Sequence, residues 1–207
     1  MAIEMSDIAV LFARQDSVYK TIPGCDVWDI ERDARRWPGG CPVVAHPPCR
    51  AWGRLRTFAK PRPDEKDLAR WAVAQIRRWG GVLEHPESSS LWADQHLPSP
   101  GSAHDAHGGW TLPIHQYWWG HRAQKKTWLY IVGCSPRDIP DIPMVLGTAA
   151  CRIRLDKRRA DGSRIKKGDP DYQPLLGDAE REHTPEALAR WLVELARRCT
   201  QQNQAAA

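Results

Sequence analysis

The stretch "VVAHPPCRAWG", residues 43–53, runs an apolar strand directly into two prolines and then presents a cysteine. Because proline continues neither a sheet ladder nor a helix, we expect the chain to leave the sheet at Pro47 and Pro48. Cys49 then lies on a stiff loop at the carboxyl end of a buried strand. Ligands of open α/β sheets bind at that edge, so this loop is the first candidate for a functional site.

Apolar runs on both sides of this loop predict the rest of a sheet. Strands are expected over 8–13, 25–30, 41–45, 80–86 and 126–133. An amphipathic stripe predicts a helix over 64–80, and Thr184 followed by Pro185 begins a second helix over 184–199. Since the order from 41 to 84 is strand, helix, strand, a parallel sheet is favoured. We predict a compact single-domain α/β fold with a mostly parallel, Rossmann-like sheet flanked by helices.

Four segments are expected along the chain. Residues 1–133 form the catalytic α/β core, and 134–183 form an irregular basic segment that is a candidate for contacts with nucleic acid. Residues 184–199 form a C-terminal helix packed on the core, and 200–207 form a disordered tail. Within the core, residues 87–116 are rich in Ser, Pro, Gly and His and predict a long loop.

Composition narrows the class of protein. A net charge of +5 and a pI of about 9.0 permit binding to nucleic acid, and residues 151–169 hold eight Lys and Arg against three Asp. No apolar run approaches the roughly 18 residues that a membrane span requires. The first residues lack a secretory pattern, and the six scattered cysteines predict free thiols. We therefore expect a cytoplasmic protein.

Reactive side chains stand at three places that a parallel sheet brings to one edge. Cys49 follows the strand 41–45, Glu84 stands near the end of the strand 80–86, and a basic group precedes the strand 126–133. The basic residues are Arg122, Lys125 and Lys126. A cysteine, a carboxyl group and basic side chains suit the addition of a thiolate to an electron-poor ring whose nitrogen is protonated during the attack.

Four segments, in order along the chain, resemble the cytosine-5 DNA methyltransferases. "AHPPCRAWG" resembles their Pro-Cys loop, and "GVLEHPESSSLW" resembles their Glu-Asn-Val segment with His85 and Pro86 in place of Asn and Val. "WWGHRAQKKTWLYIVG" is similar to a later motif, in which a glycine turn leads through basic residues into a strand. "EREHTPEALARWLVELA" is similar to the ending of short, phage-type members. The resemblance spans roughly residues 8–198 and identifies a divergent member of this family.

The resemblance implies a methyltransferase-type fold and a covalent mechanism on cytosine in DNA. Cys49 would add to C6, which makes C5 nucleophilic enough to accept a methyl group from S-adenosylmethionine. Glu84, protonated in a dry pocket, would donate to N3, and Arg122, Lys125 or Lys126 would hold the base or its phosphate. The base must leave the duplex for this reaction, so a flipped nucleotide is implied.

The cofactor half of the resemblance is degenerate. Family members carry a glycine-rich loop that cradles S-adenosylmethionine, whereas "VLFARQDSVYKTIPG" has Arg14, Gln15, Asp16 and Ser17 at that place. The candidates that remain for cofactor binding are Phe12, Arg14, Asp29, Glu31 and Pro47. An acidic residue after the second strand often binds ribose hydroxyls. Arg14 and Lys20 suit an anionic donor, such as a folate, equally well.

Contacts with DNA are expected from two groups of residues. Beside the cysteine stand Arg50, Trp52 and Arg54, and the basic run contains Arg158, Arg159, Lys166 and Lys167. Phosphate contacts from these cations would make binding depend steeply on salt. Trp52, Trp118 and Trp119 are candidates for stacking on a base.

Histidines leave two questions open. His46 and His85 flank the proposed reactive residues and either pack and cap or handle protons. The group His104, His107, His115 and His121 has no tight ligand spacing, so a polar loop is favoured over zinc and no metal is expected.

Three functions follow from these observations. The first is methylation of cytosine at C5 in DNA, in which a protein partner supplies missing sequence specificity. The second keeps the thiolate addition but changes the donor, as in folate-dependent hydroxymethylation, or acts on a free pyrimidine nucleotide. The third is a non-catalytic DNA-binding protein, for which Cys49 would be dispensable.

Overall fold

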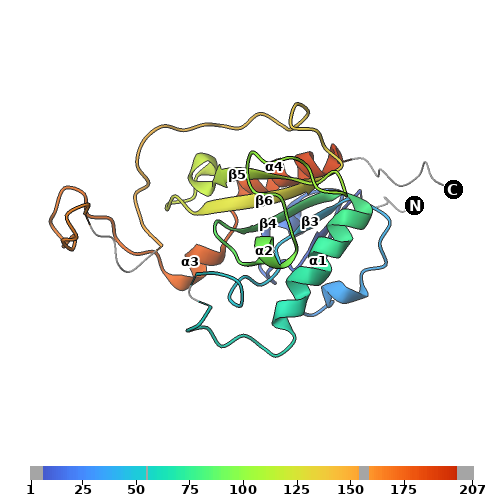
Figure 1. Cartoon of the computed structure of the whole chain (residues 1–207), viewed down its shortest axis with the longest axis horizontal. Coiled ribbons are helices and arrows are strands. Elements are labelled where there is room, and N and C mark those ends of the chain that lie inside the picture. The colour runs from blue at the N-terminus through green and yellow to red at the C-terminus, as the bar shows by residue number, and fades with distance from the viewer. Residues whose placement is uncertain (1–6, 55, 154–158, 200–207) are drawn as a thin grey trace.

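The computed structural model describes residues 7–54, 56–153 and 159–199, which form one α/β domain around a six-stranded mixed sheet (Figure 1). The strands are β1 (Ile8–Leu11), β2 (Cys25–Trp28), β3 (Val43–Ala45), β4 (Gly81–Pro86), β5 (Trp110–His115) and β6 (Lys126–Val132), in the order β2-β1-β3-β4-β6-β5. Strands β1 to β4 are parallel, whereas β6 runs antiparallel to both of its neighbours. The α/β class and the mostly parallel sheet are confirmed.

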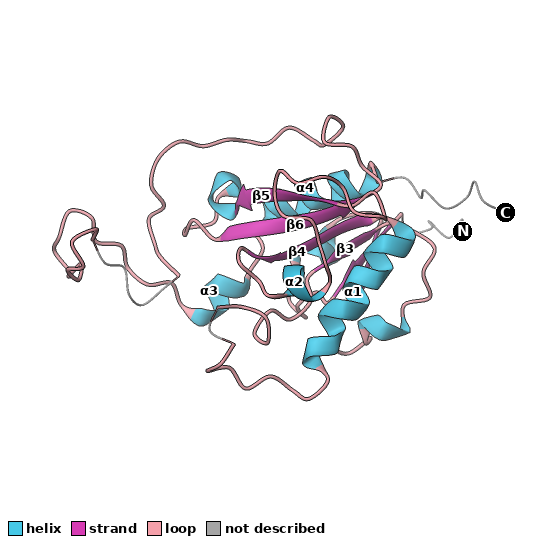
Figure 2. Cartoon of the chain, in the orientation of Figure 1, coloured by secondary structure: helices cyan, strands magenta, loops and turns pink. Residues whose placement is uncertain are grey.

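Helices cover both faces of the sheet (Figure 2). Helix α1 (Glu65–Trp79) and the short α2 (Leu91–Asp94) lie on one face, and α4 (Glu186–Arg197) lies on the other. Alternate residues of each strand serve the two cores: in β1, Ala9 and Leu11 pack on the α1 side, whereas Ile8 and Val10 pack on the α4 side. Burial on both faces explains why the strands are continuous apolar runs.

The remaining helices are short. They are η1 (Val18–Thr21), η2 (Ala34–Arg36), η3 (Gln116–Trp119) and α3 (Asp178–Glu182). Each 3₁₀ helix follows a strand and turns the chain at the sheet edge. In the described part of the chain, none of the helices has the length and apolar character that a membrane span requires.

The turn from α1 into β4 depends on a glycine pair. Gly80 ends the helix at φ 77°, and Gly81 continues at φ 120°. A Cβ on Gly81 would overlap the backbone of Val43 on β3. Glycine therefore allows β4 to lie close against β3, and this spacing sets where Glu84 stands relative to the Pro-Cys loop.

The expectation of one long loop over 87–116 is wrong. This segment contains α2 and the edge strand β5, which pairs with β6 alone. Pro113 within β5 argues against a strand when the sequence is considered alone, because proline is tolerated only where a strand lies at the edge of a sheet. Because β6 is reversed between β4 and β5, its first residues lie beside the carboxyl end of β4.

The segment 134–183, which was predicted to be irregular, leads the chain from the carboxyl end of β6 to α3 at the other end of the strands (Figure 1). Its described parts are joined to the body by bridges from Ala123 to Cys151 and from Arg152 to Leu175, and α3 closes it. The predicted tail at 200–207 lies outside the described residues.

Candidate active site

The strand order reverses between β1 and β3, because the chain passes from β1 to β2 on one side and then returns to place β3 on the other. The crevice at the carboxyl ends of such strands is where open α/β sheets bind ligands. We call the end of the molecule formed by the carboxyl ends of β1 to β4 the carboxyl edge. It receives the Pro-Cys loop from β3, Glu84 from β4, and Lys125 from the turn before β6.

The Pro-Cys loop is tightly braced, as its prolines predict. The Cys49 carbonyl accepts hydrogen bonds from the backbone N–H groups of Trp52 and Gly53 at 3.0 and 2.9 Å. Ser90 donates its backbone N–H to the Trp52 carbonyl at 3.0 Å, which joins the loop to the segment after β4. Pro47 is buried whereas Cys49 is exposed. The backbone around this exposed thiol is thus held in place by hydrogen bonds.

Cys49, Glu84 and Lys125 form one electrostatic cluster. Desolvation by the surrounding atoms, followed by the charge of Glu84, raises the pKa of the Cys49 thiol, while the Lys125 ammonium acts in the opposite direction. Desolvation likewise lowers the pKa of Lys125, and the charges of Glu84 and Cys49 oppose that shift. The charges of Glu84 and Lys125 act on Cys49, and the charge of Lys125 also acts on Glu84, so the fold has gathered three residues that lie far apart in the sequence.

Glu84 is held as a carboxylate. Burial alone would raise its pKa, but a hydrogen bond and charge from His46, together with the charge of Lys125, lower the pKa to about 2. The His46 Nδ1 lies 3.2 Å from Glu84 Oε2, and Gln116 Nε2 donates to Glu84 Oε1 at 2.9 Å. The expectation of a Glu84 that is already protonated is therefore wrong for this structure, because basic and donor groups surround it.

Backbone strain accompanies this cluster. Phe12, directly after β1, adopts φ 61°, and Lys125 adopts φ 38°. A left-handed backbone in a residue other than glycine costs about 1 kcal/mol or more, and such strain gathers at functional sites. At Lys125 the strained backbone lies immediately before the residue that starts β6.

The other two basic candidates lie outside this cluster. Arg122 is 61% exposed and donates to Glu180 of α3 at 3.0 Å. Lys126 is exposed at the start of β6. Lys125 is therefore the basic residue that the fold brings to Cys49 and Glu84, while Arg122 and Lys126 face solvent.

Two of the candidate cofactor residues are carboxylates: Asp29 is buried and has partners within the protein, whereas Glu31 is exposed. Asp29 is 4% exposed, accepts from Lys20 Nζ at 2.8 Å, and accepts from the backbone N–H of Glu31 at 3.0 Å. The hydrogen bond from Lys20 is the main reason that the pKa of Asp29 is lowered. Glu31, in contrast, is exposed and accepts from the Gln15 side chain at 2.7 Å.

Phe12 and Arg14 follow β1 and Pro47 follows β3, so these residues stand near the carboxyl ends of two neighbouring strands. Phe12 is half-buried and meets Trp71 edge to face at 5.9 Å, and Pro47 is buried. Arg14 donates to Asp16 at 2.9 Å and to Glu182 of α3 at 2.7 Å. Of the candidate cofactor residues with a charge, Glu31 is the more accessible carboxylate, and Arg14 is already paired with two carboxylates.

The expectation that Trp52 stacks on a base is wrong for this conformation. Its ring is 1% exposed and packs in the core under α1, with Lys66 Nζ 4.9 Å from the ring centroid. Trp119 is also buried, while the half-buried Trp118 stacks on His115 at 4.9 Å. Of the three tryptophans, Trp118 retains accessible ring surface.

Cations near the cysteine have two different roles. Arg50 pairs with Glu65 of α1 at 2.7 Å; because Glu65 is fully buried, this contact ties the Pro-Cys loop to the helix. Arg54 is exposed a few residues further along the loop. Arg54 is thus better placed than Arg50 to meet a phosphate.

The basic run projects from the body beyond α3 (Figure 1). Lys166 and Lys167 are exposed there, whereas Arg159 donates to Asp169 and Asp171 at 2.7 and 2.9 Å. Arg158 lies outside the described residues. The two lysines are therefore the stronger candidates for phosphate contacts.

The histidines of the 104–121 region are dispersed. His104 stacks on Trp110, and the Nδ1 of the buried His121 lies 2.8 Å from the Ala123 carbonyl. Among the residues that the structure describes, no three His, Cys, Asp or Glu side chains are gathered so that they could hold a metal ion.

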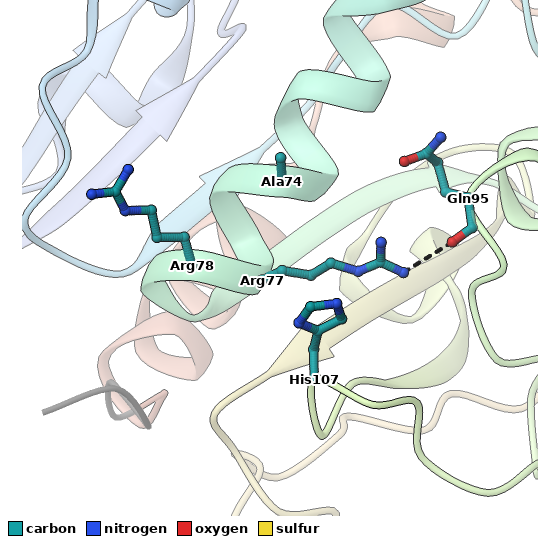
Figure 3. Close-up of a pocket in the computed structure, with 5 residues that line it drawn as sticks. All are labelled: Ala74, Arg77, Arg78, Gln95 and His107. Atoms are coloured by element: carbon teal, nitrogen blue, oxygen red, sulfur yellow. Dashed lines mark hydrogen bonds between the residues drawn. The ribbon is translucent and has the colours of Figure 1, made fainter. Parts of the chain in front are cut away.

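A shallow cavity of about 370 Å³ lies at the opposite end of the sheet, lined by Ala74, Arg77, Arg78, Gln95 and His107 (Figure 3). Arg77 donates to the Gln95 carbonyl there at 2.9 Å. Since α1 ends beside this cavity and β4 begins there, it stands at the amino ends of the parallel strands. It is remote from Cys49 and Glu84.

Sequence reasoning missed two residues of the candidate site. Tyr19, on η1, lies with its hydroxyl 2.9 Å from His46 Nε2, and Gln116, on η3, holds Glu84. No local motif marks either residue, because each reaches the site only through the folded sheet. Their burial beside His46 and Glu84 is the signal that the structure adds.

The fold and this cluster define an α/β protein with a cysteine, a carboxylate and a lysine gathered at the ligand-binding edge of its sheet. No protein-family model, curated protein or solved structure matches the chain.

Proposed function

We propose that the chain is a Rossmann-like, methyltransferase-type enzyme that methylates cytosine at C5 in DNA through a covalent Cys49 adduct. The observation that carries the proposal is the electrostatic cluster of Cys49, Glu84 and Lys125 at the carboxyl edge. The segments that contribute these residues are the ones that resemble the cytosine-5 DNA methyltransferases, in the same order along the chain.

The cluster suits nucleophilic addition to a pyrimidine ring. Cytosine C5 is too weak a nucleophile to accept an alkyl group directly. Addition of the Cys49 thiolate to C6 converts C5 into an enamine carbon that can accept one. The Glu84 carboxyl group faces N3 in this arrangement and delivers the proton that the ring nitrogen needs. Loss of the C5 proton after transfer expels Cys49 and restores the ring.

The thiol must ionise before it attacks. Because desolvation and Glu84 raise the pKa of Cys49, the thiolate is a minor species at neutral pH. The ammonium group of Lys125 opposes this shift and stabilises the thiolate. We therefore assign Lys125 to activation of the nucleophile, and we expect the rate of adduct formation to rise as the pH is raised above neutrality.

S-adenosylmethionine, when bound, supplies an electrophilic methyl group. Glu31, Phe12, Arg14 and Pro47 would hold it in the crevice between β1 and β3. Arg14 must exchange its partners Asp16 and Glu182 in order to meet the carboxylate of this donor.

DNA would approach the same edge. Arg54 on the Pro-Cys loop and Lys126 at the start of β6 are exposed on the segments that carry the cluster, and Lys166 and Lys167 are exposed on the basic run. Phosphate contacts by these exposed lysines and arginines position a duplex from which one cytosine is flipped.

The test is nucleoside mass spectrometry of DNA from cells that express the wild type or Cys49→Ala. We expect 5-methylcytosine in the first culture and none in the second. Unmodified DNA in both cultures would contradict the proposal, as would equal modification in both.

A different donor is the second candidate, and the Lys20–Asp29 pair favours it. In this pair the Asp29 carboxylate already holds a cation and is not free to bind a ribose. An anionic donor such as a folate would meet Arg14 and Lys20 after these cations exchange their carboxylate partners for it. The added mass in the same experiment distinguishes a hydroxymethyl from a methyl group, and turnover of free dCMP would identify a nucleotide-level enzyme.

A further inference from the structure

His46 lies between two buried groups of the candidate site. Its Nε2 stands 2.9 Å from the Tyr19 hydroxyl, and its Nδ1 stands 3.2 Å from Glu84 Oε2. The side chain is 13% exposed, and its backbone N–H donates to the Leu11 carbonyl at 3.0 Å, which extends the pairing of β3 with β1. The imidazole is therefore fixed by the sheet behind it and by a side chain on each ring nitrogen.

These contacts fix where the protons of the ring lie. A carboxylate only accepts hydrogen bonds, so the Nδ1 that faces Glu84 carries a proton. Burial raises the pKa of Tyr19 well above its ordinary value, so the hydroxyl keeps its proton, and its oxygen can accept a hydrogen bond from Nε2–H. By accepting from Nε2, Tyr19 favours the doubly protonated ring, whose Nδ1–H faces Glu84.

Glu84 needs such a proton source. With a pKa of about 2 it holds no proton at neutral pH, yet ring protonation requires it to deliver one. Gln116, on its other oxygen, donates an amide hydrogen that it cannot give away. Other titratable groups that interact with the charge of Glu84 are Tyr19, Cys49, Lys125 and, next along β4, His85, whose Nδ1 stands 2.7 Å from the Ser89 hydroxyl.

We propose that His46 is a positioning and proton-relay residue for adduct formation: it holds Glu84 and passes the Nδ1 proton through this carboxylate to N3 of the target cytosine. This inference rests on the proposed function and adds a residue to it. Tyr19 supports the relay by keeping the imidazole in the form that carries the Nδ1 proton.

The step balances in atoms and charge. The Cys49 Sγ–C6 bond forms as the C5=C6 double bond shifts to C4=C5 and the C4=N3 electron pair moves to N3. The imidazole ring enters this step with a proton on each nitrogen. The His46 Nδ1–H bond breaks as its proton passes to the Glu84 carboxylate, and the Glu84 O–H bond so formed breaks as the proton passes to N3. A neutral imidazole remains whose Nε2–H donates to the Tyr19 oxygen, and its Nδ1 takes up a new proton from solvent.

Exchange of the C5 hydrogen of cytosine with solvent deuterium tests the relay. The adduct has an enamine carbon at C5, which takes up a proton from water, so exchange reports adduct formation. We expect His46→Asn, which keeps a donor near Glu84 but cannot transfer a proton, to lower the exchange rate in duplex DNA about 10²-fold. The dissociation constant for DNA and the melting temperature stay close to those of the wild type.

A double-mutant cycle separates the relay from a packing role. If His46 acts through Glu84, His46→Asn causes no further loss of exchange in a Glu84→Gln background. Tyr19→Phe provides a milder second variant and is expected to slow exchange about fivefold, the effect of one hydrogen bond.

Outcomes distinguish this inference from the proposed function. Wild-type exchange in His46→Asn, or losses that multiply in the double mutant, would overturn the relay and leave the proposed function intact. Absence of exchange in the wild type, or exchange that persists in Cys49→Ala, would overturn the proposed function and the relay with it.

Discussion

Two partly buried carboxylates at opposite ends of the sheet are held by different kinds of partner. Asp105, near the cavity at the amino ends of the strands, accepts from the backbone N–H of Gly109 at 2.8 Å, from the Tyr130 hydroxyl at 2.6 Å, and pairs with Arg77 at 3.4 Å. Glu84, at the carboxyl edge, lies 3.2 Å from a ring nitrogen of His46 and interacts with the charge of Lys125, and its own charge acts on the exposed Cys49.

The comparison shows why burial alone does not mark a catalytic acid. Backbone amides and arginine remain donors at every ordinary pH, so Asp105 is locked in place and fastens the loop before β5. Histidine and lysine can gain and lose protons, so the surroundings of Glu84 can change charge during a reaction. The chemical character of the partners separates a structural carboxylate from a reactive one.

The largest expected effect is at Cys49. Cys49→Ala should reduce cytosine modification by at least about 10⁴-fold, because the covalent mechanism loses its nucleophile. Stability should change by no more than about 0.5 kcal/mol, since the residue is exposed. Cys41→Ala, at the amino end of β3, is the matched control and should stay active. Loss of activity in Cys41→Ala would show that the effect is not specific to the cysteine that follows β3.

Exchanging each carboxylate for its amide tests the comparison itself. Glu84→Gln should lower C5-hydrogen exchange per folded molecule about 10³-fold, because the proton path to N3 is cut, and should cost up to about 3 kcal/mol of stability at neutral pH, because the interactions of the ionised carboxylate are lost. Asp105→Asn should cost about 1–3 kcal/mol of stability in denaturant titrations, because its donors lose their charged acceptor, but should leave exchange per folded molecule unchanged. If Asp105→Asn lowers exchange per folded molecule and Glu84→Gln does not, the reactive carboxylate is Asp105.

Acid should lower the free energy of unfolding over two successive pH ranges, one set by His85 and one by Glu84. Burial, opposed by the charge of Glu84, lowers the pKa of His85 from 6.5 to about 4, and the surroundings of Glu84 lower its pKa from 4.5 to about 2. In each case the unfolded chain binds the proton more readily, so stability falls as the pH drops through these windows.

The size of each acid effect follows from linkage. Each shift corresponds to about 3 kcal/mol of unfolding free energy, present above the ordinary pKa and lost toward the folded one. Urea titrations at pH 7.5, 5 and 3 measure this loss. His85→Gln should flatten the upper window and Glu84→Gln the lower one, and unchanged curves in both variants would refute the assignment.

The smallest expected effect concerns DNA affinity on the basic run. Replacing Lys166 and Lys167 with Gln should reduce the slope of log K against log salt by about 2, close to one unit per phosphate contact. Arg159→Gln should change the slope less, because Asp169 and Asp171 already neutralise Arg159. Equal slopes for all variants would show that this run does not contact phosphate.

Local chemistry made part of this account predictable from the sequence. Proline after an apolar strand places Cys49 at the sheet edge, and the apolar runs predict five of the six strands with bounds within about two residues. Glu84 and the basic group before β6 follow from the same strand ends. Such features depend on neighbouring residues in the chain, and pattern reasoning captures them.

Long-range packing accounts for what the sequence did not reveal. Strand β5 was not predicted because it contains Pro113, and proline is tolerated in a strand only when the strand lies at the edge of a sheet. The burial of Trp52 depends on α1, and the charge state of Glu84 depends on His46 and Lys125, which approach from other strands. Asp29 is engaged by Lys20 through a contact across a turn that no spacing rule indicates.

The central claim is that Cys49 attacks C6 of cytosine in DNA. The most direct measurement is intact-protein mass spectrometry after incubation with S-adenosylmethionine and a random-sequence duplex that contains 5-fluorocytosine, whose C5 fluorine cannot leave as a proton. We expect a stable adduct in the wild type that peptide mapping places on Cys49 and that Cys49→Ala abolishes. An adduct on another residue, or none in the wild type, would contradict the account.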